Sequence, residues 1–399
     1  MHQAFEDSYR LGQLLGEGAC GTVYRCHRIS DGQEFAVKVV DKRRAGPQKV
    51  ECIRKEADIL RRLSHPHIVE LIDFFESATM CHIVEELLEG GELLDKIMEI
   101  KYYTENAALL LVGNIVATIK YMHDASICHR DIKPENLLLQ CRTPTDTSDL
   151  RSSQTMDDIL ADIKLVDFGV AETFTPREPS MNLHCGSLDF MAPEVIKAKK
   201  RKDHYYDEKC DLWSIGVLAY VLLCGWPPFF AETDAQLERV ILKGEYQFHK
   251  DSVWDQVSDT AKDFVSKLLV TDPANRMDTH MALEHPWLWS TGAHRCQLAQ
   301  TTTRLTRFSM MRSSQASPDF MMLQRNRSVS IFGNSVRSMS LAANSPASKA
   351  EMSALQPSLQ AFGFPMQSGG LSPDRDFSPR SSASACSGEA LPLEPEPLY

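Results

Sequence analysis

The apolar residues of this 399-residue chain change their spacing near Thr104, and this change restricts the fold more than any other feature. Before it, residues 9–40 have the pattern of a strand, a glycine-rich turn and two further strands, and a helical pattern follows at residues 49–65. After it the spacing is mainly helical, and the longest helical segments cover residues 104–123 and 210–225. We therefore predict an α+β fold in which a small β-rich lobe precedes a larger helical lobe.

The composition of the chain changes a second time, after Leu288. Residues 289–399 are rich in Ser, Pro, Gln and Ala and lack sustained periodicity, which predicts a largely disordered tail. A similar polar stretch at residues 140–158 is interpreted as a long surface insertion. One domain is thus predicted over residues 9–288. Its two lobes are expected at about 9–86 and about 92–288.

The composition also excludes several classes of protein. No window approaches the about 18 uninterrupted apolar residues of a membrane span, and the N-terminus has no apolar signal segment. The 11 cysteines form no C-x-x-C pair and no zinc-binding spacing, which indicates reduced thiols and a cytosolic or nuclear location. The formal net charge of −11 argues against a general nucleic-acid binder.

Gly16, Gly18 and Gly21 form a G-x-G-x-x-G turn whose backbone can approach phosphate groups closely. The same string occurs in ordinary glycine-rich hairpins and in dinucleotide sites, but a dinucleotide site needs a helix directly after the glycines, and here a strand follows. Lys38 lies in the next apolar strand, where an unpaired ammonium is costly to bury. Glu56 and nucleotide phosphates are natural partners for it; the alternative is a surface lysine at a strand edge.

The motifs HRDIKPEN and DFG contain polar side chains at the spacing that phosphoryl transfer uses. Asp131 can accept the proton of an attacking hydroxyl, and Asn136 and Asp167 supply the oxygen ligands that Mg²⁺ requires. Lys133 can neutralise charge on the transferred phosphate. A single carboxylate in a loop is usually only solvated surface, but the joint occurrence of these residues in this order indicates phosphoryl transfer.

With these motifs, residues 9–288 resemble a eukaryotic protein kinase catalytic domain. The APE motif at residues 192–194, the DLWSIG motif at 211–216 and Arg276, at the place of the kinase arginine that pairs with the APE glutamate, support the resemblance. The strings GGEL, GWPPF and HPWL are similar to those of the calcium/calmodulin-dependent kinase group. Lys133, two residues after Asp131, and Ser187, before the APE motif, follow the serine/threonine pattern.

The resemblance implies that ATP and Mg²⁺ are used, with Asp131 and Lys133 in the catalytic step and Asn136 and Asp167 as metal ligands. The residues implied in ATP binding are Leu15, Gly16, Glu17, Gly18, Ala19, Cys20, Gly21, Thr22, Val23, Ala36, Lys38, Glu56, Glu86, Leu88 and Leu138. Within this set, Val23, Ala36 and Leu138 would enclose the adenine, and the backbone of Glu86 and Leu88 would hydrogen-bond its edge. The apolar spine linking the lobes would consist of His129, Phe168, Leu60 and Leu71.

The resemblance also implies which residues contact a protein substrate. Ser187 would do so, and Glu92 and Glu135 match carboxylates that can engage guanidinium groups in a paired geometry. They imply protein substrates with arginine three residues before the target. The tail contains such a site, because Arg325 precedes Ser328 by three residues.

The sequence around Ser328 matches the group's consensus further, with Leu323 five residues before it and Phe332 four residues after it. We therefore hypothesise that Ser328 is a substrate of this protein's own active site. The alternative is a chance match, since Arg and Ser are common in disordered segments.

Two positions depart from the kinase pattern. Leu183 stands where many kinases have a phosphorylatable threonine, so Arg130 lacks its usual phosphate partner. Three alternatives are open: Glu178 holds the loop, modified Ser180 holds it, or the loop is active as made. Glu85 stands just before the segment between the lobes, where the family usually has an apolar or small residue. It either faces the nucleotide and Lys38 or, with a shift of one residue, turns outward.

Regulation is suggested by residues 285–318, which contain no acidic residue. The family often has an autoinhibitory, calmodulin-binding helix here, but the apolar spacing is loose and three consecutive threonines are poor helix formers, so a simple basic linker is the alternative. For the whole protein, an active kinase competes with a pseudokinase scaffold. The scaffold is disfavoured because Lys38, Glu56, Asp131 and Asp167 are all present.

Overall fold

The computed structural model describes residues 4–18, 21–99, 103–140, 162–175, 179–183, 185–200, 203–249, 253–290 and 297–315. Ala19 and Cys20 of the glycine-rich turn, Glu178, the insertion beyond Gln140 and the tail site at Ser328 lie outside these residues. Among the helices of the described ranges, none is long and apolar enough to cross a lipid bilayer.

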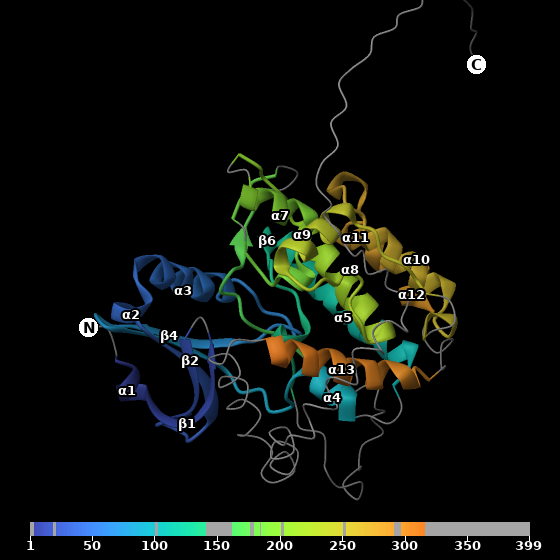
Figure 1. The fold of residues 1–399 in the computed structure, drawn as a ribbon. Helices are drawn as coiled ribbons and strands as arrows, with labels where there is room; N and C mark the ends of the chain where they lie inside the picture. The colour runs from blue at the N-terminus through green and yellow to red at the C-terminus, as the bar shows by residue number, and fades with distance from the viewer. Residues whose placement is uncertain are drawn as a thin grey trace, which may run out of the picture. The chain divides into compact units, whose positions relative to one another are not determined.

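The N-terminal lobe contains a β-sheet, which confirms the predicted β-rich lobe (Figure 1). The sheet has five antiparallel strands in the order β1-β2-β3-β5-β4. Its strands are β1 (Tyr9–Gly18), β2 (Gly21–Arg28), β3 (Glu34–Asp41), β4 (Leu71–Glu76) and β5 (Met80–Glu86). The helices of this lobe are α1 (Phe5–Ser8), α2 (Lys42–Ala45) and α3 (Pro47–Leu60). Lys38 pairs across strands with Ile83, and Ile83 packs with Ile53 of α3, so Lys38 is on the face of the sheet that α3 covers.

The C-terminal lobe is helical, as predicted, and is built around α5 (Glu105–Asp124) and α8 (Lys209–Cys224), which contact each other. Every residue from Cys210 to Cys224 is buried, because α8 is apolar on all sides and forms the centre of the lobe. The other helices of this lobe are α4 (Leu93–Glu99), α7 (Pro193–Lys200), α9 (Asp234–Lys243), α10 (Asp259–Leu268), α11 (Thr279–Leu283) and α12 (Pro286–Trp289). Short 3₁₀ turns are η1 (Pro134–Asn136), η3 (Leu188–Phe190), η4 (Val253–Asp255) and η5 (Pro273–Asn275).

Two short antiparallel ladders hold the motif loops. β6 (Ile127–Cys128) pairs with β9 (Glu172–Thr173), and β7 (Leu137–Leu139) pairs with β8 (Ile163–Leu165). The HRDIKPEN motif connects β6 to β7, and the DFG motif connects β8 to β9. Since both loops are held at both ends by the same two ladders, the two motifs lie next to each other.

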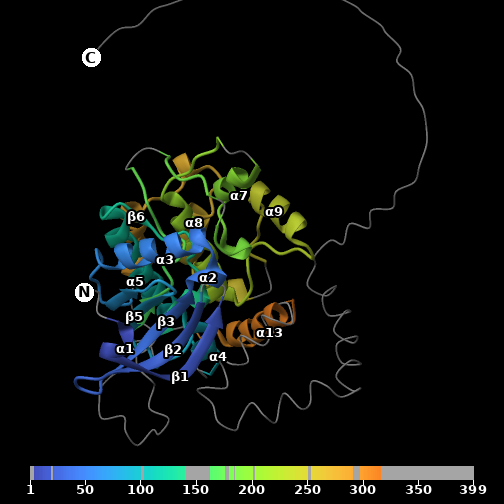
Figure 2. The same cartoon turned by 90° about the vertical axis from the view of Figure 1, so that its left-hand side faces the viewer.

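Within the tail that was predicted to be largely disordered, residues Ala299–Gln315 form the helix α13, which contacts α4 and α8 and lies beside α4 in both views (Figures 1 and 2). The Phe308 ring of α13 packs against Trp226 with ring centroids 5.9 Å apart. The Thr301 hydroxyl donates a hydrogen bond of 2.8 Å to the backbone oxygen of Leu223. Tertiary contacts of this kind outweigh the weak intrinsic preference of threonine against helix.

Candidate active site

The glycine-rich turn is the end of a β-hairpin. Gly16 pairs with Val23 and Gly18 pairs with Gly21, so a strand follows the glycines and the dinucleotide alternative is excluded. Gly21 has a φ of +141°, and a Cβ atom there would lie 2.8 Å from the backbone oxygen of Val39. Only glycine therefore fits this position without strain. The same hairpin carries Leu15, Glu17 and Thr22.

Lys38 is buried and has the carboxylate partners that its apolar strand requires. Its Nζ atom lies 2.7 and 2.9 Å from the two carboxylate oxygens of Glu56 and 3.2 Å from Oδ1 of Asp167. Burial alone would lower the pKa of Lys38, but the negative charges of Glu56 and Asp167 raise it above its usual value. The positive charge of Lys38 in turn lowers the pKa of Asp167. The alternative of a surface lysine is thereby excluded.

Asp131 is the centre of a hydrogen-bonded group between β6 and β7. Lys133 Nζ donates to Asp131 Oδ2 at 2.6 Å and to the hydroxyl of Ser187 at 2.8 Å. The backbone N–H of Ser187 donates to Asp131 Oδ1 at 2.8 Å, and Asn136 Nδ2 donates to the backbone oxygen of Asp131, also at 2.8 Å. Ser187 is distant in sequence, yet it completes the group formed by the residues of the HRDIKPEN motif.

Asn136 and Asp167 offer a donor set that fits Mg²⁺. The residue before Asp167, Val166, donates its backbone N–H to the backbone oxygen of Asn136 at 3.0 Å, which holds the two segments together. Asp167 has a φ of +62°, a backbone conformation that is uncommon for residues other than glycine and that concentrates at functional sites. One carboxylate and one amide oxygen are hard donors of the kind that Mg²⁺ prefers.

The predicted adenine-site residues come from both lobes. Val23 is on β2, Ala36 is on β3, and Leu138 is on β7 of the C-terminal lobe. Glu86 ends β5, and its carboxylate forms an ion pair with Lys164 of β8. The segment that follows contains Leu88, which packs against the large core of the C-terminal lobe.

The two predicted substrate carboxylates also lie close to this segment. Glu92 pairs through its backbone with Leu138, and Glu135 is in η1, three residues before Leu138. The helix α4, which begins directly after Glu92, contacts η1.

Glu85 lies on the same face of the sheet as Lys38, so the outward alternative is wrong. It pairs across strands with Ala36, two residues from Lys38, and therefore shares the face of the sheet that carries Lys38. Burial and the negative charge of Glu56 raise the pKa of Glu85 to about 8. Within the described residues, Lys38 donates its hydrogen bonds to Glu56 and Asp167 and none to Glu85.

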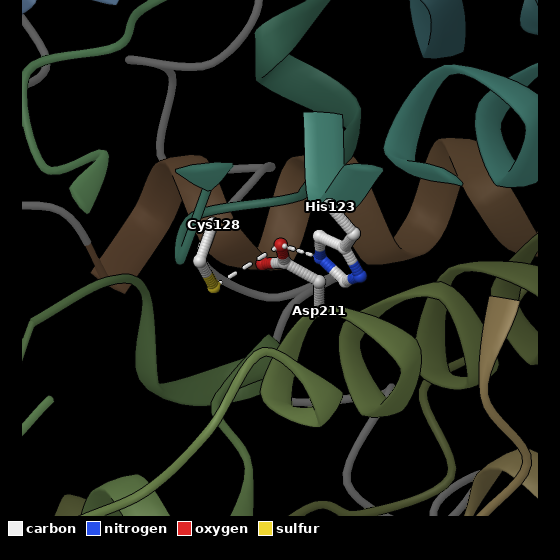
Figure 3. Close-up of side chains that lie close together, drawn as sticks. All are labelled: His123, Cys128 and Asp211. Carbon is white, nitrogen blue, oxygen red and sulfur yellow. Dashed lines mark hydrogen bonds and ion pairs between the residues drawn. The ribbon is translucent and has the colours of Figure 1, made fainter. Parts of the chain in front are cut away.

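Asp211, at the start of α8, anchors the beginning of the catalytic loop, which is the HRDIKPEN segment (Figure 3). Asp211 Oδ2 lies 2.9 Å from His123 Nε2 and 3.2 Å from the Cys128 sulfur, and it also accepts the backbone N–H of His129 at 2.9 Å. Ligands around a tetrahedral Zn²⁺ at about 2.0–2.3 Å from the metal would lie roughly 3.3–3.8 Å apart. The shorter separations are those of hydrogen bonds, so we interpret this group as an anchor rather than a metal site.

Two further contacts connect predicted residues. His129 packs edge-on against Phe168 of the DFG motif, with ring centroids 5.0 Å apart, as the apolar spine requires. Arg276 forms two hydrogen bonds of 2.6 and 3.0 Å with the carboxylate of Glu194, the APE glutamate. Both members of this ion pair are buried, and the Arg276 guanidinium also stacks over the Trp213 ring at 5.2 Å.

The fold and the site together define a protein kinase. A protein kinase domain model matches residues 9–288. The chain belongs to the protein kinase family, and within it to the serine/threonine kinases of the calcium/calmodulin-dependent group. It is an ATP-dependent protein kinase.

Relatives within this group are similar over most of the chain. Calcium/calmodulin-dependent protein kinase type 1 from Caenorhabditis elegans is 40% identical over 283 residues, which cover 71% of this chain and 74% of that protein. Myosin light chain kinase A from Dictyostelium discoideum is 36% identical over 289 residues, which cover 72% of this chain and 90% of that protein. Calcium-dependent protein kinase 14 from Arabidopsis thaliana is 37% identical over 310 residues, which cover 77% of this chain and 54% of that protein.

Sequence reasoning missed the residues that support the catalytic loop. His123 and Asp211 lie 88 positions apart, and no local pattern indicates that they meet. Arg130 was expected to lack its usual phosphate partner, and its side chain instead donates to the backbone oxygen of Val170 at 2.7 Å and to the Tyr206 hydroxyl at 3.3 Å. These two partners come from two segments that are distant from Arg130 in the sequence, so only the folded chain shows them.

Proposed function

We propose that this protein transfers the γ-phosphate of ATP to serine or threonine in protein sites that have arginine three residues before the target. The observation that carries the proposal is the Asp131–Lys133–Ser187 group, which lies beside the Lys38–Glu56–Asp167 group because the same two ladders hold both motif loops. The group around Asp131 would bind and deprotonate the acceptor hydroxyl, and the group around Lys38 would bind the nucleotide.

In the proposed reaction, the substrate hydroxyl donates its proton to Asp131 while its oxygen attacks the γ-phosphorus of ATP. Lys133 neutralises charge on the transferred group, and the Ser187 contacts keep both side chains in place. Lys38, held by Glu56, positions the α and β phosphates. Mg²⁺, which Asn136 and Asp167 would hold, supplies neutralisation of the phosphate charge.

The proposed preference for arginine three residues before the target rests on Glu92 and Glu135. A guanidinium group forms strong paired hydrogen bonds with carboxylates, so two carboxylates near the acceptor site favour a basic residue upstream of the target. Ser328, with Arg325 before it, is the proposed site in the protein's own tail.

The experiment incubates the full-length protein with Mg²⁺ and ATP and maps phosphosites by mass spectrometry, with Asp167→Asn as the inactive control. Matched peptides around Ser328 that differ only in arginine or alanine at the minus 3 position then measure specificity. We expect phosphate on Ser328 and a higher kcat/KM for the arginine peptide, and Glu135→Gln should reduce the difference between the two peptides. Equal rates for the two peptides would refute the arginine preference. Transfer to no site and no peptide would support the scaffold alternative.

Calmodulin is a proposed regulatory partner, because α13 is a helix with basic and apolar residues. Arg307 is exposed, whereas Leu305 and Phe308 are buried against the C-terminal lobe. Calmodulin targets present apolar anchors on a basic helix, so binding would need to draw α13 off the kinase domain. Calcium-dependent protection of α13 by calmodulin, lost in Phe308→Asp, is the expected result; no binding would favour the basic-linker alternative.

We further propose that the protein acts in the cytosol or nucleus. All seven cysteines within the described residues are free thiols, which is the state expected in a reducing compartment. Imaging of the tagged full-length protein tests this proposal, and localisation to the secretory pathway would contradict it.

A further inference from the structure

The activation segment, residues 167–194, lacks a phosphorylatable residue at Leu183, but its described part around Met181 and Leu183 is held in place by contacts with Tyr206. Its backbone bridges from Met181 to Tyr206, and the Tyr206 hydroxyl donates a hydrogen bond of 2.6 Å to the backbone oxygen of Leu183. Arg130, next to the catalytic aspartate, donates to that same hydroxyl. A polar pocket lies between these elements, and its lining residues include Arg130, Glu172, Ser180 and Leu183.

Glu172, on β9, connects this pocket to the N-terminal lobe. One carboxylate oxygen of Glu172 forms an ion pair with Lys55 of α3, and the other lies 3.6 Å from Arg130 Nη2. Glu172 is itself held by backbone pairing with Cys128, directly before the catalytic loop. A single fixed carboxylate therefore contacts cations from both lobes.

We infer that Glu172 is a positioning residue that takes the place of an activation-segment phosphate, so that the kinase is competent as made. The two cations are next to the residues that carry the chemistry: Lys55 precedes Glu56, and Arg130 precedes Asp131. An anion between them draws α3 toward the catalytic loop and keeps Glu56 facing Lys38. A phosphate in this pocket would do the same by pairing with Arg130, and the Glu172 carboxylate supplies that negative charge permanently.

The contacts and exposure of the other residues at the pocket are consistent with a positioning role for Glu172. The Ser180 hydroxyl accepts the backbone N–H of Thr175 at 3.1 Å, so it already serves the local turn. The Arg130 side chain is 4% exposed, whereas the side chains of Lys55 and Glu172 are 40% and 25% exposed. The ion pair with Lys55 is therefore screened by water, and its effect on catalysis comes from geometry more than from stability.

The test uses full-length protein treated with phosphatase, with the absence of phosphate in the activation segment checked by mass spectrometry. Initial rates with ATP and a peptide substrate are compared for wild type, Glu172→Gln and Lys55→Met. The matched control is Glu51→Gln, which removes an exposed carboxylate that forms an ion pair with Arg54 on α3, the helix of Lys55. We expect Glu172→Gln to lower kcat about tenfold, equivalent to about 1.4 kcal/mol in activation free energy, with little change in KM for the peptide.

A rescue separates positioning from folding stability. In the Glu172→Gln background, Leu183→Asp places a carboxylate in the same pocket and should recover most of the lost kcat. The inference rests on the proposed kinase activity. The activity of the unphosphorylated wild type distinguishes a failure of the inference from a failure of the proposed function. A wild type that is inactive without phosphate but active after treatment with an upstream kinase overturns the inference and leaves the proposed function intact. Full activity of Glu172→Gln, or failure of Leu183→Asp to restore it, overturns the inference as well.

Discussion

Replacing Glu85 by glutamine is expected to remove a pH-dependent loss of stability from the folded kinase. Glu85 is on the sheet face of Lys38 and interacts electrostatically with Glu56, Lys38 and Asp167, and its pKa is raised from 4.5 to about 8. Glutamine has the same shape as protonated glutamate but cannot ionise. The variant therefore represents the neutral state of Glu85 at every pH.

The sign and size of the change in stability with pH follow from the linkage between proton binding and folding. Between the ordinary pKa of 4.5 and about 8, the folded protein holds a proton that the unfolded chain has lost, so stability falls as the pH rises through this range. The slope for one such group is at most about 1.4 kcal/mol per pH unit, or about 3 kcal/mol between about pH 5.5 and about pH 7.5. Glu85 is only half-buried, and water stabilises part of its charge, so we expect about 1–2 kcal/mol over this range.

The assay is urea denaturation of wild type and Glu85→Gln at both pH values, followed by fluorescence. The two proteins should be similar at the lower pH, and the variant should be more stable at the higher pH. Glu89→Gln, a partly exposed carboxylate on the same segment, controls for the loss of a charge. A constant difference between wild type and Glu85→Gln at both pH values would refute the raised pKa.

Three further results are expected. Glu85→Met should lower KM for ATP most at about pH 8 and above, where Glu85 is charged, because it removes a carboxylate that competes with ATP for Lys38; an unchanged or higher KM would count against this idea. Glu194→Gln should cost about 3–5 kcal/mol in unfolding free energy, since it leaves the buried Arg276 without its charged partner, and denaturation at neutral pH measures it. Gly225→Val should displace α13, because a Cβ atom there would lie 2.5 Å from the backbone oxygen of Thr301; faster hydrogen exchange in α13 with retained kinase activity is the expected result, and unchanged exchange would contradict it.

The catalytic residues could be predicted because their identities and spacing are local. Asp131, Lys133 and Asn136 are within one loop, and the chemistry of phosphoryl transfer explains why these residue types occur together. The fold class was predictable for a similar reason, since the change from strand to helix spacing is visible along the chain. The sequence left open whether residues 299–315 form a helix or a basic linker, because the stability of α13 comes from burial against α4 and α8 and not from its own sequence preference.

By itself, the sequence of this protein determined the lobes, the nucleotide and catalytic motifs and the kinase group, because each depends on neighbouring residues or on a regular period. Only the tertiary structure decided that Glu85 faces Lys38, that Asp211 anchors the catalytic loop, and that Glu172 lies between Lys55 and Arg130. The physical reason is that strand register and long-range packing bring these charges together. The interaction of two charges depends on their separation and burial in space, and their distance along the chain determines neither.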